Sequence, residues 1–185
     1  MSHRDDVLSA CLQALNRDAT ASMADLASAA GISRATLHRH VDSRDALLVE
    51  LGTRSLDRWE QRLDTVGVEQ VAASGDADTV VAALESLVLA YVEDADDYGF
   101  ALTDQVILAN ADLERRTQHL ADRETALFRA AQAVGVLRAD LPAAWMGHAV
   151  YGLLVAVREA RRVGDVAPRG AGALVLETFR RGVGA

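Results

Sequence analysis

The stretch that most constrains the fold of this chain is residues 22–44, SMADLASAAGISRATLHRHVDSR. Ser22 is a suitable N-cap, because its side-chain oxygen can accept an unpaired N–H of the first helical turn. Asp25 lies three residues later and completes a capping-box pattern. Gly31 allows a sharp turn after this helix, since glycine adopts a left-handed backbone at little cost. Four apolar residues before the glycine have the i, i+3, i+4, i+7 spacing of one helical face: Met23, Leu26, Ala27 and Ala30.

A second short helix is predicted over about 33–40, with Ser33 as its N-cap. Leu37 and Val41 lie four residues apart and should face inward. The remaining side chains carry no carboxylate and should face outward: Arg34, Ala35, Thr36, His38 and Arg39. Arginine can bond a guanine edge bidentately, and threonine can contact a thymine methyl group or a phosphate. The stretch therefore predicts a helix-turn-helix whose second helix fits a DNA major groove, the alternative being an ordinary surface helix.

The pattern A-x-x-A-G-I-S-x-x-T-L-x-x-x-V, with the Asp42–Leu48 segment after it, resembles the DNA-binding segment of TetR-type (tetracycline-repressor-like) transcriptional regulators. The family usually has tyrosine where this chain has His38, phenylalanine at Val41 and lysine at Arg44. Histidine and arginine can also contact a phosphate. The motif and the resemblance together give this set of expected DNA-binding residues: Ser22, Ser33, Arg34, Ala35, Thr36, His38, Arg39 and Arg44.

Composition favours helix along the whole chain, with 50% hydrophobic residues and only two prolines. We expect an all-α fold of about nine helices. An N-terminal three-helix helix-turn-helix domain would cover residues 1–48, and a larger C-terminal helical domain for ligand binding and dimerisation would cover 49–185. The net charge of −8 makes general attraction to DNA modest, although Arg34 and Arg39 give the recognition helix a local positive charge.

Periodicity predicts most of the helices directly. We expect helices over 3–16, from about 43 to 65, and over 78–95, 99–109, 113–134 and 145–157, with a last one after Pro168 and a loop over 67–77. The penultimate helix is apolar nearly all round, so it needs cover on several sides, and we expect it to join the last helix in a homodimer interface. The expected interface residues are Gly147, Tyr151, Gly152, Val155, Leu174, Val175, Thr178 and Phe179.

Nothing in the sequence predicts catalysis. It shows no nucleophile elbow, phosphate-binding glycine loop or zinc spacing, and we expect neither a cofactor nor a metal. Cys11 is the single cysteine and is expected to be a buried thiol, which fits a reducing cytoplasm. The N-terminus lacks the apolar core of a signal peptide, and the weakly charged run 141–157 is too short to span a bilayer comfortably, so we expect a cytoplasmic protein without a membrane partner.

The resemblance implies a ligand-responsive transcription factor, with repressor favoured over activator, that binds a palindromic double-stranded DNA operator as a homodimer and is released by a small-molecule effector. A non-catalytic helical module for protein interaction is the alternative. The effector cavity is expected in the second domain, where large or polar side chains are the candidates, although each is equally suited to a core or interface role. These are Trp59, Tyr91, Phe100, Gln105, His119, Trp145 and His148.

Overall fold

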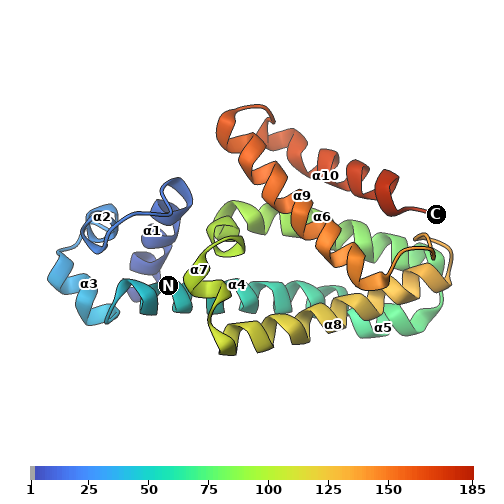
Figure 1. Cartoon of the computed structure of the whole chain (residues 1–185), viewed down its shortest axis with the longest axis horizontal. Helices are drawn as coiled ribbons and strands as arrows, with labels where there is room; N and C mark the ends of the chain where they lie inside the picture. The colour runs from blue at the N-terminus through green and yellow to red at the C-terminus, as the bar shows by residue number, and fades with distance from the viewer. Residues whose placement is uncertain (1–2) are drawn as a thin grey trace. The chain divides into compact units, whose positions relative to one another are not determined.

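The computed structural model describes residues 3–185. Nearly all of the regular secondary structure in this range is helical (Figure 1). This confirms the all-α class. Ten α-helices and one 3₁₀-helix lie in the described range. They are α1 (His3–Arg17), α2 (Met23–Ala29), α3 (Arg34–His40), α4 (Arg44–Val66), α5 (Val68–Ser74), α6 (Ala77–Tyr98), η1 (Gly99–Leu102), α7 (Gln105–Leu108), α8 (Ala111–Ala133), α9 (Ala143–Val163) and α10 (Pro168–Val183).

The chain folds into two compact units. Unit 1 contains the residues up to Leu56 together with Asp96–Glu114, and unit 2 contains Asp57–Ala95 and Arg115–Ala185. The segment around η1 and α7 therefore packs with the N-terminal helices. The boundary near residue 48 was predicted from the motif and stays a prediction.

Unit 1 is built on a core that α1, α2, α3 and the start of α4 share with η1 and α7. Its fully buried side chains include Leu8, Leu26, Leu37, Leu47 and Phe100. Asn16 ties the end of α1 to the end of α6: its amide nitrogen donates to the carbonyls of Asp96 and Asp97, and its amide oxygen accepts the N–H of Phe100 at 3.2 Å. One side chain thus fixes the N-terminal helices to the η1 segment.

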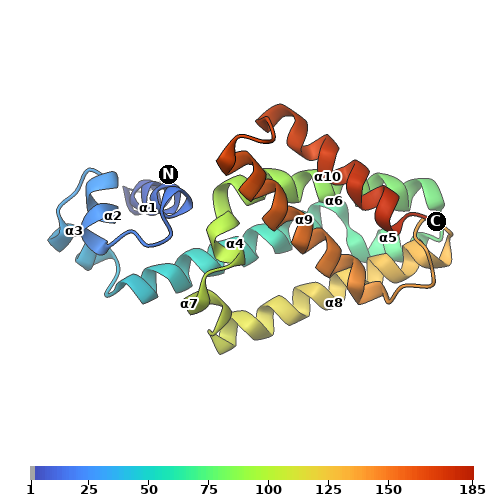
Figure 2. The ribbon, with the colours of Figure 1, turned by 45° about the horizontal axis from the view of Figure 1, so that its top comes forward.

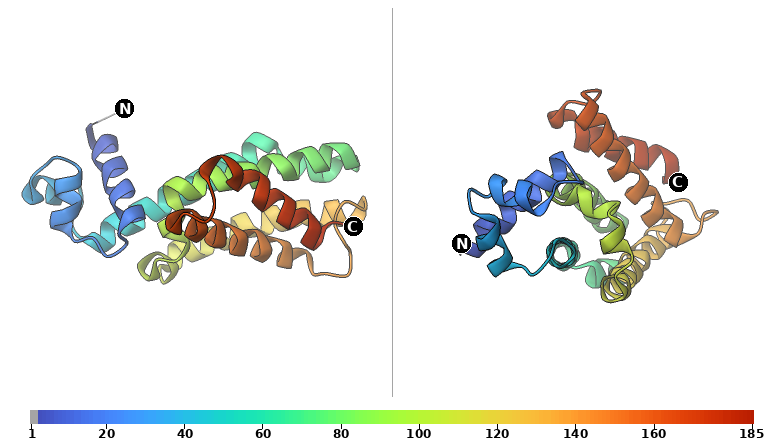
Figure 3. Two further views of the ribbon diagram at one scale, coloured as in Figure 1. Left: turned by 90° about the horizontal axis from the view of Figure 1, so that it is seen from above. Right: turned by 60° about the vertical axis from the view of Figure 1, so that its left-hand side comes forward.

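Unit 2 is a bundle of the second part of α4 with α5, α6, α8, α9 and α10. The last two helices run antiparallel as an adjacent pair, drawn in orange and red (Figures 1 and 2), and the left view of Figure 3 shows them side by side again. Phe128 of α8 and Phe179 of α10 contact one another with ring centroids 6.4 Å apart. A short backbone pairing between Leu137 and Gly184 joins the α8–α9 connection to the end of α10.

Two local predictions were wrong. Residues 67–77 were predicted as a loop, but α5 occupies most of them, between Gly67 and Gly75, which both have positive φ angles of 69° and 65°. The glycines therefore bound a helix instead of preventing one. The single helix predicted over 99–109 is divided into η1 and α7, because Asp104 accepts the N–H groups of Val106 and Ile107 and starts a new helix.

Candidate nucleic-acid interface

The start of α2 has the predicted capping box. The Ser22 side-chain oxygen accepts the N–H of Asp25 at 3.3 Å, and the Asp25 carboxylate accepts the backbone N–H of Ser22 at 2.9 Å and its hydroxyl at 2.6 Å. These hydrogen bonds from Ser22 lower the pKa of Asp25. The helix therefore begins at a fixed residue with a negative charge at its positive end.

The turn between α2 and α3 depends on Gly31, whose φ is +67°. Its N–H donates to Ser28 at 3.0 Å, and the N–H of Ile32 donates to Ala27 at 3.0 Å. The Ser33 hydroxyl accepts the N–H of Thr36 at 3.0 Å, which confirms Ser33 as the N-cap of α3. Leu37 is fully buried against the core of unit 1, so the opposite side of α3 must face solvent.

The predicted recognition face of α3 is accessible. Ser33, Arg34, Ala35, His38 and Arg39 are exposed, and Thr36 is half-buried. The Thr36 hydroxyl lies 2.9 Å from that of Ser33 and accepts a hydrogen bond from Arg39 Nη2 at 3.2 Å. This contact holds the Arg39 guanidinium along the helix surface, while its remaining N–H groups stay available to an acceptor such as a base edge.

His38 and Arg44 already make contacts within unit 1. His38 Nδ1 lies 3.3 Å from the carbonyl of Asp42, and because a carbonyl only accepts, Nδ1 carries the proton in this contact. Arg44 Nε donates to the carbonyl of Ala21 at 3.0 Å, and its Nη2 donates to Ala19. Arg44 therefore fixes the α1–α2 connection. The sequence predicted a phosphate contact for Arg44 but not this structural role.

The seven predicted effector residues are not gathered at one place. Trp59 and Tyr91 meet in unit 2, where the indole N–H donates to the phenol oxygen at 2.9 Å. Phe100 is buried in the core of unit 1, because η1 packs against α1, and Gln105 lines a surface hollow of the same unit beside Arg44. The other three are exposed on unit 2: His119, Trp145 and His148.

Glu124 of α8 completes the Trp59–Tyr91 pair and was missed in the sequence. Its carboxyl group hydrogen-bonds the Tyr91 hydroxyl, and burial raises its pKa to about 7. Burial also raises the pKa of Tyr91. The signal was present, since Glu124 lies four residues after Leu120 and three before Leu127 and so shares the apolar stripe of α8.

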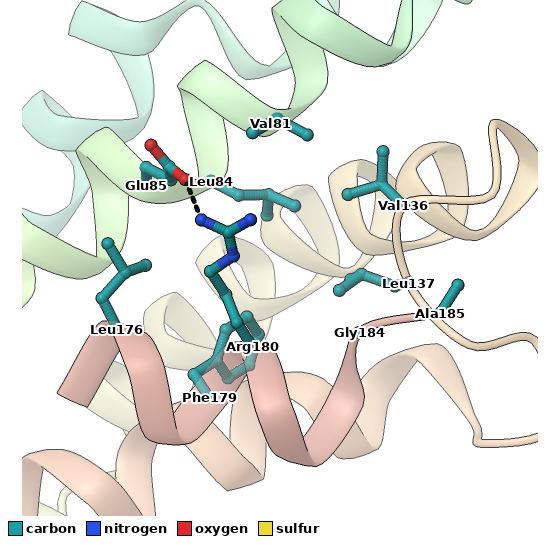
Figure 4. Close-up of a pocket in the computed structure, with 10 residues that line it drawn as sticks. All are labelled: Val81, Leu84, Glu85, Val136, Leu137, Leu176, Phe179, Arg180, Gly184 and Ala185. Atoms are coloured by element: carbon teal, nitrogen blue, oxygen red, sulfur yellow. Dashed lines mark hydrogen bonds and ion pairs between the residues drawn. The ribbon is translucent and has the colours of Figure 1, made fainter. Parts of the chain in front are cut away.

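A separate cavity of about 230 Å³ lies in unit 2 between α6, α10 and the α8–α9 connection. Figure 4 shows its apolar walls and the ion pair between Arg180 and Glu85, whose atoms are 2.7 Å apart. The walls include Val81, Leu84, Leu137 and Phe179, and the residues predicted to bind an effector lie elsewhere.

The expected interface residues fall into two groups. Val175 and Phe179 are only 2% and 3% exposed, because they face inward from α10, so their assignment to a dimer contact was wrong and they belong to the core of unit 2. Tyr151 and Leu174 are 44% and 48% exposed, and Gly152 and Thr178 are also exposed. Gly147 and Val155 are half-buried on α9. An apolar face remains on the α9–α10 pair.

Over residues 3–185, no cluster of three or more histidine, cysteine or acidic side chains is arranged to hold a metal ion. Within the same range, every helix is too short or too polar to cross a lipid bilayer.

Residues 18–51 match the family model described as "Bacterial regulatory proteins, tetR family". No curated protein sequence matches the chain. Among solved structures, the TetR-like regulator LfrR from Mycobacterium smegmatis, in complex with proflavine, has a TM-score of 0.75 at 22% identity, covering 99% of this chain and 97% of that one.

Two other solved structures extend this likeness. AibR, in complex with isovaleryl coenzyme A and operator DNA, gives a TM-score of 0.70 at 14% identity and covers 94% and 96% of the two chains. A TetR family member from Streptomyces coelicolor gives 0.65 at 26% identity, with 94% and 87% covered. The helix-turn-helix segment therefore matches the model of the tetR family of bacterial regulatory proteins, and the fold of the whole chain is similar to that of solved TetR-type regulators.

Proposed function

We propose that this transcriptional regulator is a repressor that binds a palindromic DNA operator as a homodimer and leaves it when a small-molecule effector binds. The observation that carries the proposal is the exposed, carboxylate-free face of α3, held outward by the burial of Leu37. In each subunit this face would enter the major groove of one half-site, and a twofold axis would match the two halves of a palindrome.

Arg39, supported by the Thr36 hydroxyl, is the side chain that we assign to base contact. Arg34 and His38 are both exposed, four residues apart on α3, and suit contacts to the flanking phosphates. Because His38 Nδ1 already contacts the Asp42 carbonyl, Nε2 is the ring nitrogen that we assign to a phosphate contact. The phosphate contacts would set the position of the protein on the DNA, and the base contact of Arg39 would set its sequence preference.

The effector response is supported by connectivity and by relatives. Helix α6 begins in unit 2 and ends in unit 1, where its last carbonyls accept hydrogen bonds from Asn16 of α1. LfrR was solved with proflavine, and AibR with a coenzyme A ester and operator DNA. A ligand would release the operator only by preferring one arrangement of the protein over another.

The test is a gel-shift assay with DNA flanking the gene, using the parent, Arg39→Ala and Thr36→Ala. We expect either substitution to weaken specific binding by about 5- to 150-fold, since one good base contact contributes roughly 1–3 kcal/mol of discrimination. Arg169→Ala, an exposed arginine of α10, is the charge-matched control and should bind like the parent.

Circular dichroism and light scattering would establish that the variants keep the parent's fold and oligomeric state. Parent-like binding by both α3 variants would show that the recognition face is placed wrongly. If the parent itself binds no flanking DNA while remaining folded, the alternative of a helical protein-interaction module gains support.

A further inference from the structure

Glu124 is the only buried carboxyl group in the part of the chain that the structure describes, with 6% of its side chain exposed. It comes from α8 and lies in an interior that is otherwise apolar apart from Tyr91, the edge of Trp59 and Thr125. An ionised carboxylate in such surroundings is costly unless a cation or several hydrogen-bond donors compensate it. Its partners therefore decide what the group can do.

The donors that the protein supplies form one chain across three helices. The Trp59 indole of α4 donates to the Tyr91 oxygen of α6, and the Tyr91 hydroxyl donates to the Glu124 carboxylate. A carboxylate can accept about four hydrogen bonds. The phenol hydroxyl satisfies only part of that capacity, and it is a neutral donor.

The nearby arginines of α8 are engaged with other acids. Arg116 pairs with Asp57 and Glu60 at 2.7 and 2.5 Å, and Arg123 pairs with Asp64 and Glu69 at 2.7 and 2.6 Å. Burial has the largest effect on the pKa of Glu124 and raises it, whereas the hydrogen bond with Tyr91 lowers it. No basic side chain contributes to this pKa. The buried acid thus lacks the positive partner that would stabilise its charged form.

Helix α9 packs its backbone directly against this carboxyl group. A Cβ atom at Gly147 would lie 3.2 Å from Glu124 Oε2 and 3.7 Å from the Phe128 ring, so even a methyl group is tight there. A glycine inside a helix costs up to about 1 kcal/mol relative to alanine. Because this space is filled, a molecule that approaches the carboxylate from the α9 side must displace α9, the helix that carries the exposed Trp145 and Tyr151.

We propose that Glu124 is the recognition point for a cationic effector, an organic ammonium with an apolar body. Its positively charged nitrogen takes the place of the Tyr91 hydroxyl at the Glu124 carboxylate, and its apolar part lies between α8 and α9. Binding moves α9 away from α8, and with it the helix face that we assign to the dimer. This inference rests on the proposed effector response and specifies the chemical class of the effector.

The test is isothermal titration calorimetry of the full chain with three probes that share a phenylpropyl body: 3-phenylpropylammonium, 3-phenylpropanol and 3-phenylpropanoate. At about pH 8 the carboxyl group of Glu124 is ionised in most molecules, since its pKa is about 7. We expect the ammonium to bind at least tenfold tighter than the alcohol, and the carboxylate to bind more weakly than both.

Glu124→Gln keeps the shape of the side chain and should reduce ammonium affinity to that of the alcohol. Glu114→Gln, an exposed acid on the same helix, is the matched control and should keep the preference. Tyr91→Phe removes the competing hydroxyl and should also retain it, so it serves as a second variant if Glu124→Gln folds poorly. Its loss of the preference would show that the phenol is the recognition group and would overturn the proposal.

Equal binding of ammonium and alcohol, an unchanged preference in Glu124→Gln, or no heat from any probe with the parent would overturn the proposal. A gel shift of the parent with and without the ammonium separates this result from the proposed function. Glu124-dependent binding of the ammonium by a protein that binds no operator would support the site and reject the regulator. Operator binding without any ammonium preference would do the reverse.

Discussion

Burial of Glu124 makes the stability of unit 2 depend on pH. The pKa of this carboxyl group rises from 4.5 to about 7 in the folded chain, so the folded state holds the proton more tightly than the unfolded one. Its stabilising contribution is complete below about pH 4.5 and is lost as the pH rises through about 7. A shift of this size corresponds to a loss of up to roughly 3 kcal/mol.

Urea unfolding of the parent and of Glu124→Gln at a series of pH values measures this effect. As the pH rises from about 5 to about 8, we expect the unfolding free energy of the parent to fall relative to that of Glu124→Gln. Glu114→Gln should follow the parent at every pH, since Glu114 is exposed. Parallel curves for the parent and Glu124→Gln would mean that Glu124 titrates as it does in the unfolded chain.

Residue identity predicted local contacts better than distant ones. Ser22, Asp25 and Ser33 cap their helices as expected, because a cap is decided by residues two or three positions apart. Arg44 was predicted as a DNA-binding residue that can contact a phosphate, and in the structure it donates to the carbonyls of Ala19 and Ala21, more than twenty positions earlier. Such a partner depends on how the helices pack, which the local sequence does not encode.

At the scale of the element, the turn between α2 and α3 depends on the backbone of Gly31. A Cβ atom there would meet nothing within 4 Å, so the positive φ is the reason for glycine at this position. We expect Gly31→Ala to lower the free energy of unfolding by about 1 kcal/mol. Gly31→Asn should cost less, because asparagine tolerates the left-handed region.

Chemical denaturation of the three proteins would give these differences, with Gly182→Ala as the control, since Gly182 lies in a helix with open space around it. Gly182→Ala should be neutral or stabilising. A Gly31→Ala protein as stable as the parent would show that the turn relaxes to another conformation, and its operator affinity would then report whether α3 moved.

Helix prediction succeeded where a long apolar stripe repeats and failed where side chains are small. The stripes of α6 and α8 gave those helices to within a few residues of their ends. Residues 67–77 hold few large apolar side chains, so periodicity could not show that Val68 and Val71 are buried. Glu124 was not predicted to be buried, because glutamate is rarely buried and its position on the apolar stripe of α8 is the only signal that the sequence contains.

At the scale of the whole molecule, assembly is what gives α3 its proposed function, because one short helix reads only half of a palindrome. We assign pairing to α9 and α10, because these helices expose three large apolar side chains: Trp145 at 53%, Tyr151 at 44% and Leu174 at 48%. Monomeric proteins rarely expose several large apolar side chains together. Val175 and Phe179 face inward although they were predicted at the interface. Core and interface positions of α10 are both apolar, so periodicity could not distinguish them.

Gly152 offers a direct test of this pairing, because a Cβ at that position would meet nothing within 4 Å beyond its chain neighbours and the backbone of its own helix. We expect Gly152→Arg to leave the subunit folded, since the new side chain can extend into solvent, and to convert a dimer into a monomer. In a twofold interface the substitution acts twice, so two buried, unpaired guanidinium groups would oppose association. Light scattering at micromolar concentration measures the change, and operator affinity should fall with it.

His119→Arg, which places the same charge on an exposed position of α8, should remain dimeric. A dimeric Gly152→Arg protein would move the interface away from α9, and a monomeric parent would remove the reason for expecting a palindrome.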